Sequence, residues 1–101
     1  MTATARSIRT EEWAPDGLYM TLLGFLPHYR TRRGKLDVRR LGDDLDPGKS
    51  PEAIWKWLRK DKFLGDNARA VIRLAATPEN RDMLIQDGRQ PPTMADFIDF
   101  V

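Results

Sequence analysis

The sequence predicts an all-α fold, a compact bundle of about five helices followed by an extended C-terminal tail. Apolar residues recur three or four positions apart in several segments, and no segment alternates apolar and polar residues for long enough to form a convincing strand. Residues that start and stop helices separate these segments. With 101 residues, the chain is long enough to bury one core without metals or crosslinks.

The composition excludes several classes of protein. The absence of cysteine excludes disulfide scaffolds, thiolate zinc sites and cysteine nucleophiles. The sequence contains no apolar run of about 18 residues and no export signal, so we expect a cytoplasmic protein without a membrane partner. His28 is the only histidine, and no phosphate-binding glycine loop or Ser-His-Asp arrangement is present. We therefore expect no catalytic site, metal or cofactor.

Charge is distributed unevenly along the chain, although the net charge is only +2. Residues 30–62 contain eleven Lys or Arg against six Asp or Glu, whereas residues 77–101 contain two against five. A basic central region favours a polyanionic partner such as DNA. Exposed Lys and Arg also keep surfaces soluble, so charge alone leaves both interpretations open.

The first segments are an arm and a core helix. Residues 1–10 are small, polar and aperiodic, and we interpret them as a flexible arm that either follows a DNA groove or has no role. Leu18, Leu22 and Leu26 have helical spacing, and Pro27 predicts that this first helix ends by residue 26.

A cationic loop and a second helix follow. Residues 30–35 read R-T-R-R-G-K and form either a solvated connector or a set of phosphate contacts. Residues 36–45 should be helical, with Asp37 as the N-cap, until Asp46-Pro47-Gly48 stops the helix.

The central segment, residues 50–60, is the clearest helix signal. Ser50 is a good N-cap, Pro51 suits the first helical position, and Glu52 complements the helix dipole. One face carries the apolar residues Ile54, Trp57 and Leu58, for which we expect a core position. The other face carries Trp55, Lys56, Arg59 and Lys60, and a basic, partly aromatic face of this kind suits the major groove of DNA.

Two more helices and a tail complete the chain. We expect helices at 66–76, capped by Asp66 or Asn67, and from Thr77 to Asp87, where Met83, Leu84 and Ile85 supply the apolar residues. The tail is acidic but rich in large apolar residues, so it should dock either on its own domain or on a second subunit. Pro91-Pro92 should hold the tail away from its domain, which favours a homodimer formed through Met94, Phe97, Ile98 and Phe100.

Residues 36–60 resemble the helix-turn-helix of bacterial, plasmid and phage transcriptional repressors, including the Cro-like regulators. The matching residues are Leu41-Gly42, Leu45, Gly48, Ser50, Ala53, Ile54 and Trp57-Leu58. Asp46-Pro47 lengthens the turn by two residues relative to that family. The resemblance divides the chain into an arm (1–10), a helical DNA-binding domain (11–88) and a docking or dimerisation tail (89–101).

The resemblance implies roles for individual residues. Pro51, Glu52, Trp55 and Lys56 would contact bases, with Lys56 reaching guanine and Glu52 reaching cytosine. Trp55 lies at the edge of the apolar face, so it either contacts the groove or packs within the protein. Contacts to the DNA backbone would come from Arg30, Arg32, Arg33, Lys35, Lys49, Ser50, Arg59, Lys60 and Lys62.

The sequence thus favours a sequence-specific transcriptional regulator of double-stranded DNA, most simply a nucleoid-associated repressor that binds two half-sites as a homodimer. The alternative is a small adaptor or inhibitor that binds an acidic partner protein through the helix at 50–60, with Trp55 as the anchor.

Overall fold

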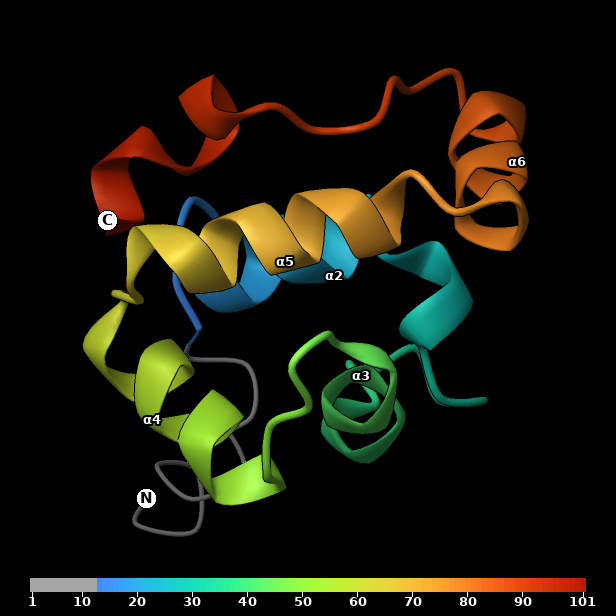
Figure 1. Ribbon diagram of the computed structural model, residues 1–101. Coiled ribbons are helices and arrows are strands. Elements are labelled where there is room, and N and C mark those ends of the chain that lie inside the picture. Colours follow the sequence, from blue (N-terminus) through green and yellow to red (C-terminus); the bar gives the residue numbers. More distant parts are fainter. Residues whose placement is uncertain (1–12) are drawn as a thin grey trace, which may run out of the picture.

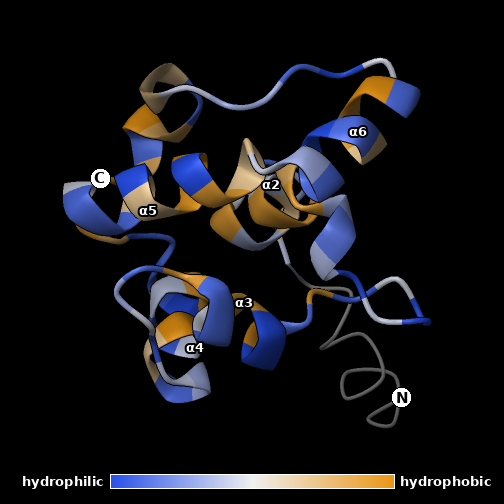
Figure 2. Ribbon diagram, turned by 45° about the vertical axis from the view of Figure 1, so that its right-hand side comes forward, coloured by the Kyte–Doolittle hydropathy of each residue, from blue (hydrophilic) through white to orange (hydrophobic). Residues whose placement is uncertain are grey.

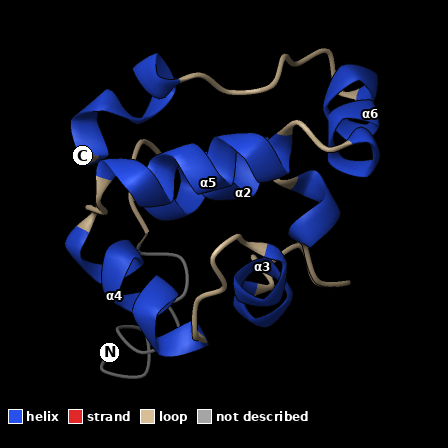
Figure 3. Cartoon of the chain, in the orientation of Figure 1, coloured by secondary structure: helices blue, strands red, loops and turns tan. Residues whose placement is uncertain are grey.

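The computed structural model describes residues 13–101, which form five α-helices and two short 3₁₀ helices (Figures 1 and 3). The elements are α2 (Leu18–Phe25), η2 (Pro27–Tyr29), α3 (Val38–Asp44), α4 (Pro51–Lys60), α5 (Gly65–Ala75), α6 (Pro78–Gln86) and η3 (Met94–Phe100). Within this range there is no β-strand, only an isolated antiparallel bridge between Arg30 and Leu36. The prediction of an all-α fold is confirmed.

Helix α2 lies at the centre of the molecule. Figure 2 shows that it is hydrophobic along most of its length, and both Leu18 and Leu22 are completely buried. The backbone N–H of Leu18 donates a hydrogen bond of 3.0 Å to Asp61 Oδ1, so a residue that follows α4 caps the start of α2. As predicted, the helix ends before Pro27, which begins η2.

Helices α3 and α4 meet at a close backbone contact. The Lys49 N–H donates to the carbonyl oxygen of Gly42 at 2.9 Å, and a Cβ atom on Gly42 would lie only 2.1 Å from the Lys49 carbonyl oxygen. A glycine is therefore required inside α3. Both predicted N-caps are present, because Asp37 accepts a hydrogen bond from the Arg40 N–H and Ser50 accepts one from the Ala53 N–H.

Helix α5 runs beside α2 and buries Ala68, Val71 and Ala75 completely (Figure 1). It begins at Gly65, with Leu64 as the N-cap residue, so the prediction that Asp66 or Asn67 caps this helix is wrong. The Asp66 carboxylate instead lies 2.7 Å from Arg69 within the first turn of α5.

Helix α6 starts after Thr77 and ends at Gln86, close to the predicted limits. Its apolar content was overestimated, because Leu84 is buried but Met83 and Ile85 are exposed. A polar residue holds the helix in place. Asn80 is completely buried, donates to the carbonyl oxygens of Phe25 and Ala75, and accepts from the His28 N–H.

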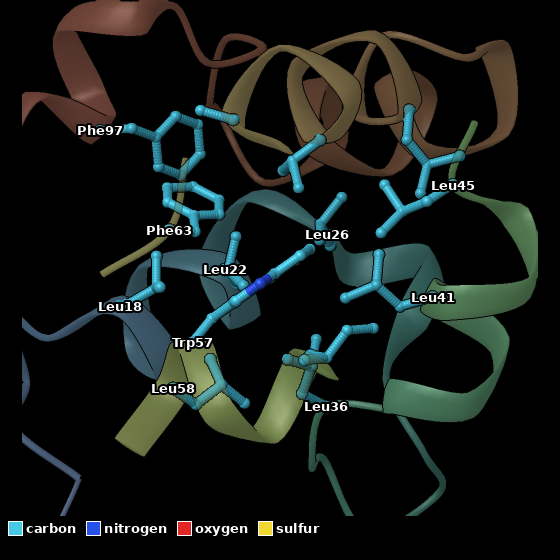
Figure 4. Close-up of a cluster of buried hydrophobic side chains, with 14 of the residues drawn as sticks. Leu18, Leu22, Leu26, Leu36, Leu41, Leu45, Trp57, Leu58, Phe63 and Phe97 are labelled. Atoms are coloured by element: carbon cyan, nitrogen blue, oxygen red, sulfur yellow. The ribbon is translucent and has the colours of Figure 1, made fainter. Parts of the chain in front are cut away.

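The C-terminal segment crosses back over α5 and ends beside the α4–α5 connection (Figure 1). Phe97 is completely buried, with its ring centroid 5.7 Å from that of Phe63, and the Phe63 N–H donates to the Phe100 carbonyl oxygen at 2.8 Å. The expectation that Pro91-Pro92 holds the tail away from its domain is therefore corrected. Residues 89–93 instead bridge α6 and η3. As a result, Phe97 and Phe100 of η3 join the hydrophobic core, in which Figure 4 shows Phe97.

Candidate nucleic-acid interface

The outer face of α4 is polar and exposed. Ile54, Trp57 and Leu58 point into the core, where Figure 4 shows Trp57 and Leu58 among the leucines of α2 and α3. At 3.6 residues per turn, Lys56 lies about 200° around the helix from Ile54. Glu52, Lys56 and Arg59 accordingly share the exposed face. This arrangement agrees with the predicted division of the helix into a buried and a basic face.

Several cations outside α4 are engaged by the fold itself. The Arg30 guanidinium donates two hydrogen bonds, of 3.0 and 3.1 Å, to the Leu23 carbonyl oxygen near the end of α2. Arg40 lies over the ring of Tyr29, with its guanidinium carbon 5.0 Å from the ring centroid. Arg30 was predicted to contact phosphate, but in this structure its side chain already closes the end of α2.

The other predicted DNA-contacting cations are free of such interactions. Within residues 13–101, none of their side chains makes an ion pair or hydrogen bond with another residue; they are Arg32, Arg33, Lys35, Lys49, Lys56, Arg59, Lys60 and Lys62. Apart from Lys49, which is half-buried, all of them are exposed. These charges are available to a polyanion.

The cationic loop at 30–36 is a defined hairpin. The Thr31 hydroxyl oxygen accepts hydrogen bonds from the backbone N–H groups of Arg33 and Lys35, and the Thr31 N–H donates to the Lys35 carbonyl oxygen at 2.7 Å. Gly34 has a φ of 80°, in the left-handed region that favours glycine. The hairpin therefore presents Arg32, Arg33 and Lys35 on a fixed backbone.

A hollow of about 480 Å³ joins this hairpin to α4. Its floor includes Leu36, Tyr19 and Trp55, and its rim includes the hairpin cations Arg32, Arg33 and Lys35. Of the α4 residues that the sequence assigned to DNA, Trp55 therefore lies beside the three hairpin cations.

Trp55 belongs to an aromatic stack that the sequence did not reveal. Its ring centroid lies 6.1 Å from that of Trp13 and 6.4 Å from that of Tyr19, and all three rings are close to parallel. The Tyr19 hydroxyl also accepts a hydrogen bond from the Leu36 N–H. Trp55 therefore packs within the protein, as one of the two alternatives proposed, but it stays half-buried and lines the hollow.

Asp44, the last residue of α3, has a structural role. The Tyr29 hydroxyl donates a hydrogen bond of 2.8 Å to Asp44 Oδ2. Burial raises the pKa of Tyr29, and the hydrogen bond to Asp44 raises it further, so the phenol stays protonated as a donor. In residues 13–101, no group of three or more His, Asp or Glu side chains is arranged to hold a metal ion.

The residues predicted to form a dimer contact separate into two groups. Phe97 and Phe100 are buried in the core of their own chain, so neither ring is free to contact a partner, which corrects their assignment to a dimer surface. Met94 is half-buried, whereas 63% of the Ile98 side chain is exposed. Of the four residues, Ile98 alone presents a large apolar surface to solvent.

Comparison with known proteins identifies no relative. No protein-family model, curated protein or solved structure matches this chain. The described helices are also too short to cross a bilayer, the longest being the eleven residues of α5. The candidate interface on α4 and the hairpin therefore rests on geometry and charge alone.

Proposed function

We propose that this protein is a sequence-specific, double-stranded DNA-binding transcriptional regulator that places α4 in the major groove. The observation that carries the proposal is the outer face of α4, on which Lys56 and Arg59 are exposed and have no ion-pair partner among the described residues. An α-helix with its side chains measures about 10–12 Å across, which fits a major groove about 12 Å wide.

The support beneath α4 suits a helix that must dock rigidly. Ser50 caps its first turn, the contact between Gly42 and Lys49 fixes its approach to α3, and Asp61 connects its last turn to α2. A two-helix unit with a buried inner face and a free outer face is the geometry that helix-turn-helix proteins use. The regulatory role, most simply repression, follows from the resemblance of residues 36–60.

Roles within the interface follow from position along α4. Glu52 and Lys56 occupy the exposed face of the N-terminal half, from which they reach cytosine N4 and guanine O6 or N7. Pro51 and Trp55 border this face, and Trp55 presents its exposed edge to a thymine methyl or to the sugar-phosphate backbone. The phosphate contacts come from the N-terminal end at Lys49 and Ser50, from Arg59, Lys60 and Lys62, and from the hairpin residues Arg32, Arg33 and Lys35.

A selection experiment tests the proposal directly. Double-stranded oligonucleotides bound by the protein are selected from a random pool at about 150 mM salt, and the affinity for the enriched sequence is then measured against salt concentration. We expect a palindromic consensus with half-sites about 34 Å apart, and an affinity that falls steeply as salt increases. No enrichment would refute DNA recognition and would support the adaptor function, in which α4 binds an acidic protein.

Two variants separate reading of bases from contact with phosphates. Lys56→Ala should change which base is preferred at one position of the consensus, because a side chain on the groove-facing surface is lost. Lys62→Ala should weaken binding to all sequences and reduce the slope of log affinity against log salt by about 1. Arg81→Ala is the control, because Arg81 is an exposed cation on α6, away from α4. Equal losses in all three variants would contradict these roles.

A further inference from the structure

The chain ends beside the α4–α5 connection (Figure 1), and three large apolar residues in these two segments are exposed. The exposed fractions are 74% for Leu64, 63% for Ile98 and 39% for Val101. The hydrogen bond between the Phe63 N–H and the Phe100 carbonyl oxygen places Leu64 next to the C-terminal segment. A cluster of exposed large apolar residues is typical of a surface that binds another protein.

One part of this surface is a hollow with a basic rim, which we call the lysine-rimmed hollow. It has a volume of about 400 Å³ and an apolar lining that includes Trp57, Phe63, Leu64 and Val101. The charged residues that line it are Lys56, Lys60 and Lys62, and no Asp or Glu is among its lining residues. The hollow therefore suits an apolar side chain that is accompanied by a negative charge.

The same end of the chain carries such a group, which we call the acidic corner and which consists of Ile98 and Asp99 on η3. Both residues are exposed. Asp99 makes no ion pair or hydrogen bond with another described residue, whereas the nearby Asp96 accepts a hydrogen bond of 2.8 Å from the Thr93 N–H as part of the cap of η3. Asp99 is thus the carboxylate that is free to meet a cation of a partner.

We propose that the chain forms a two-fold symmetric dimer in which the acidic corner of each copy occupies the lysine-rimmed hollow of the other. In a two-fold interface the same surface patch serves both subunits, so a surface that contains an apolar knob and an apolar hollow of opposite charge is self-complementary. Ile98 supplies the apolar contact. Asp99 faces Lys60 and Lys62 of the second copy, which sets the orientation of the two chains.

This dimer does not depend on the proposed function, and it competes with part of it, because Lys56, Lys60 and Lys62, which were assigned to DNA, also line the hollow. Helical geometry places Lys60 about 100° around α4 from Arg59, on the side toward the hollow. Arg59 and Glu52 are absent from the lining of the hollow, so the dimer leaves them free on the outer face. In the dimer, Lys60 and Lys62 contact the second copy, so Arg59 and Lys49 take over the phosphate contacts proposed for them. A loss of DNA affinity in Lys62→Ala is therefore assigned to a phosphate contact only if sedimentation shows that the variant is still dimeric.

Sedimentation velocity without DNA tests the apolar contact. We expect the unmodified chain to be dimeric at protein concentrations of tens of micromolar, roughly the range of a modest interface. Ile98→Arg should weaken dimerisation by at least about tenfold, because it removes the apolar contact and sets a cation against the lysines. The control is Ile85→Arg, at an isoleucine that is 57% exposed on α6, and it should leave the dimer intact. Circular dichroism verifies that each variant is folded.

A charge exchange tests the reciprocal geometry. Asp99→Lys should be monomeric, and the double variant Lys60→Glu with Lys62→Glu should be monomeric as well, because each sets like charges against one another. An equimolar mixture of these two variants should form a heterodimer, since both of its contacts again join opposite charges.

The proposal is overturned by a monomeric unmodified chain at about 200 µM, well above a micromolar dissociation constant. It is also overturned by an unaffected Asp99→Lys dimer, or by a mixture that stays monomeric. If the dimer forms but no DNA sequence is enriched, the proposed function is refuted and the proposed dimer interface is retained.

Discussion

Helices α4 and α5 follow one another in the chain, have ten and eleven residues, and each bury one apolar face, yet their charged residues behave differently. On α5, Arg69 pairs with Asp66 at 2.7 Å, and Arg73 donates to the Asp46 carbonyl oxygen at 3.2 Å. On α4, the side chains of Lys56, Arg59 and Lys60 have no such partner within residues 13–101. The cations of α5 are thus used within the fold, and those of α4 are available to a partner.

The two helices also differ in the elements that pack against them. Helix α5 packs against η3 and α6, and its exposed residues are the charged Asp66, Arg69 and Arg73. Helix α4 packs against α2 and α3 with its inner side, whereas Glu52, Lys56 and Arg59 on its outer side are exposed. The two helices thus differ in whether their cations have partners within the fold, and this difference is what the proposed role of α4 rests on.

The largest expected effect on stability concerns η3, which packs on α5. Phe97→Ala should lower the free energy of unfolding by about 3–5 kcal/mol, because it removes a completely buried ring that contacts Phe63 and Phe25. Urea denaturation measures the loss. The adjacent Ile98→Ala is a matched control at an exposed position, and at protein concentrations that keep the chain monomeric it should change stability by less than about 0.5 kcal/mol. Similar losses in both variants would mean that η3 does not pack on α5 as described.

An intermediate effect concerns the support of α4. Gly42→Ala should cost about 1–3 kcal/mol, because the new methyl group would collide with the Lys49 carbonyl oxygen and force α3 and α4 apart. The corresponding change in α5, Gly65→Ala, introduces a Cβ atom with no neighbour within 4 Å. It should be neutral or stabilise the protein by up to about 1 kcal/mol. Thermal unfolding followed by circular dichroism compares the two variants, and a harmless Gly42→Ala would refute the close contact.

The smallest expected effect on stability comes from removing one arginine from each helix, and DNA binding by these variants tests whether the two helices differ in function. Arg59→Ala in α4 and Arg69→Ala in α5 should each change the free energy of unfolding by less than about 0.5 kcal/mol, since Arg59 is unpaired and the pair of Arg69 is exposed to solvent. Fluorescence anisotropy with the selected duplex should nevertheless show weaker binding for Arg59→Ala and unchanged binding for Arg69→Ala. Equal affinities for the two variants would remove the functional distinction between the helices.

Local signals in the sequence predicted most of the helix positions. Ser50-Pro51 and Asp37 mark helix starts because a side-chain acceptor and a proline act within one turn of the residue that carries them. Pro27 likewise ends α2 by local sterics. Helical spacing also identified Trp57 as a core residue, since periodicity alone shows which face of α4 is apolar.

Features that depend on distant contacts could not be predicted in this way. The stack of Trp13, Tyr19 and Trp55 joins two segments more than thirty residues apart, and nothing in either segment reveals the other. The return of the C-terminal segment depends on Phe97 finding a site beside Phe63 and Phe25. In α5, an available carboxylate at Asp66 suggested a cap, but Asp66 already lies within the first turn of the helix and pairs with Arg69.

The hydrogen bond that Asp61 accepts couples the end of α4 to the start of α2. Asp61 has a φ of 53°, directly follows the last turn of α4, and accepts the hydrogen bond of the first amide of α2. One carboxylate thus joins the residue after α4 to the backbone of α2, in addition to the packing between the two helices. A displacement of α4 that moves Asp61 takes this acceptor away from the amide of Leu18, so the end of α4 and the start of α2 are coupled.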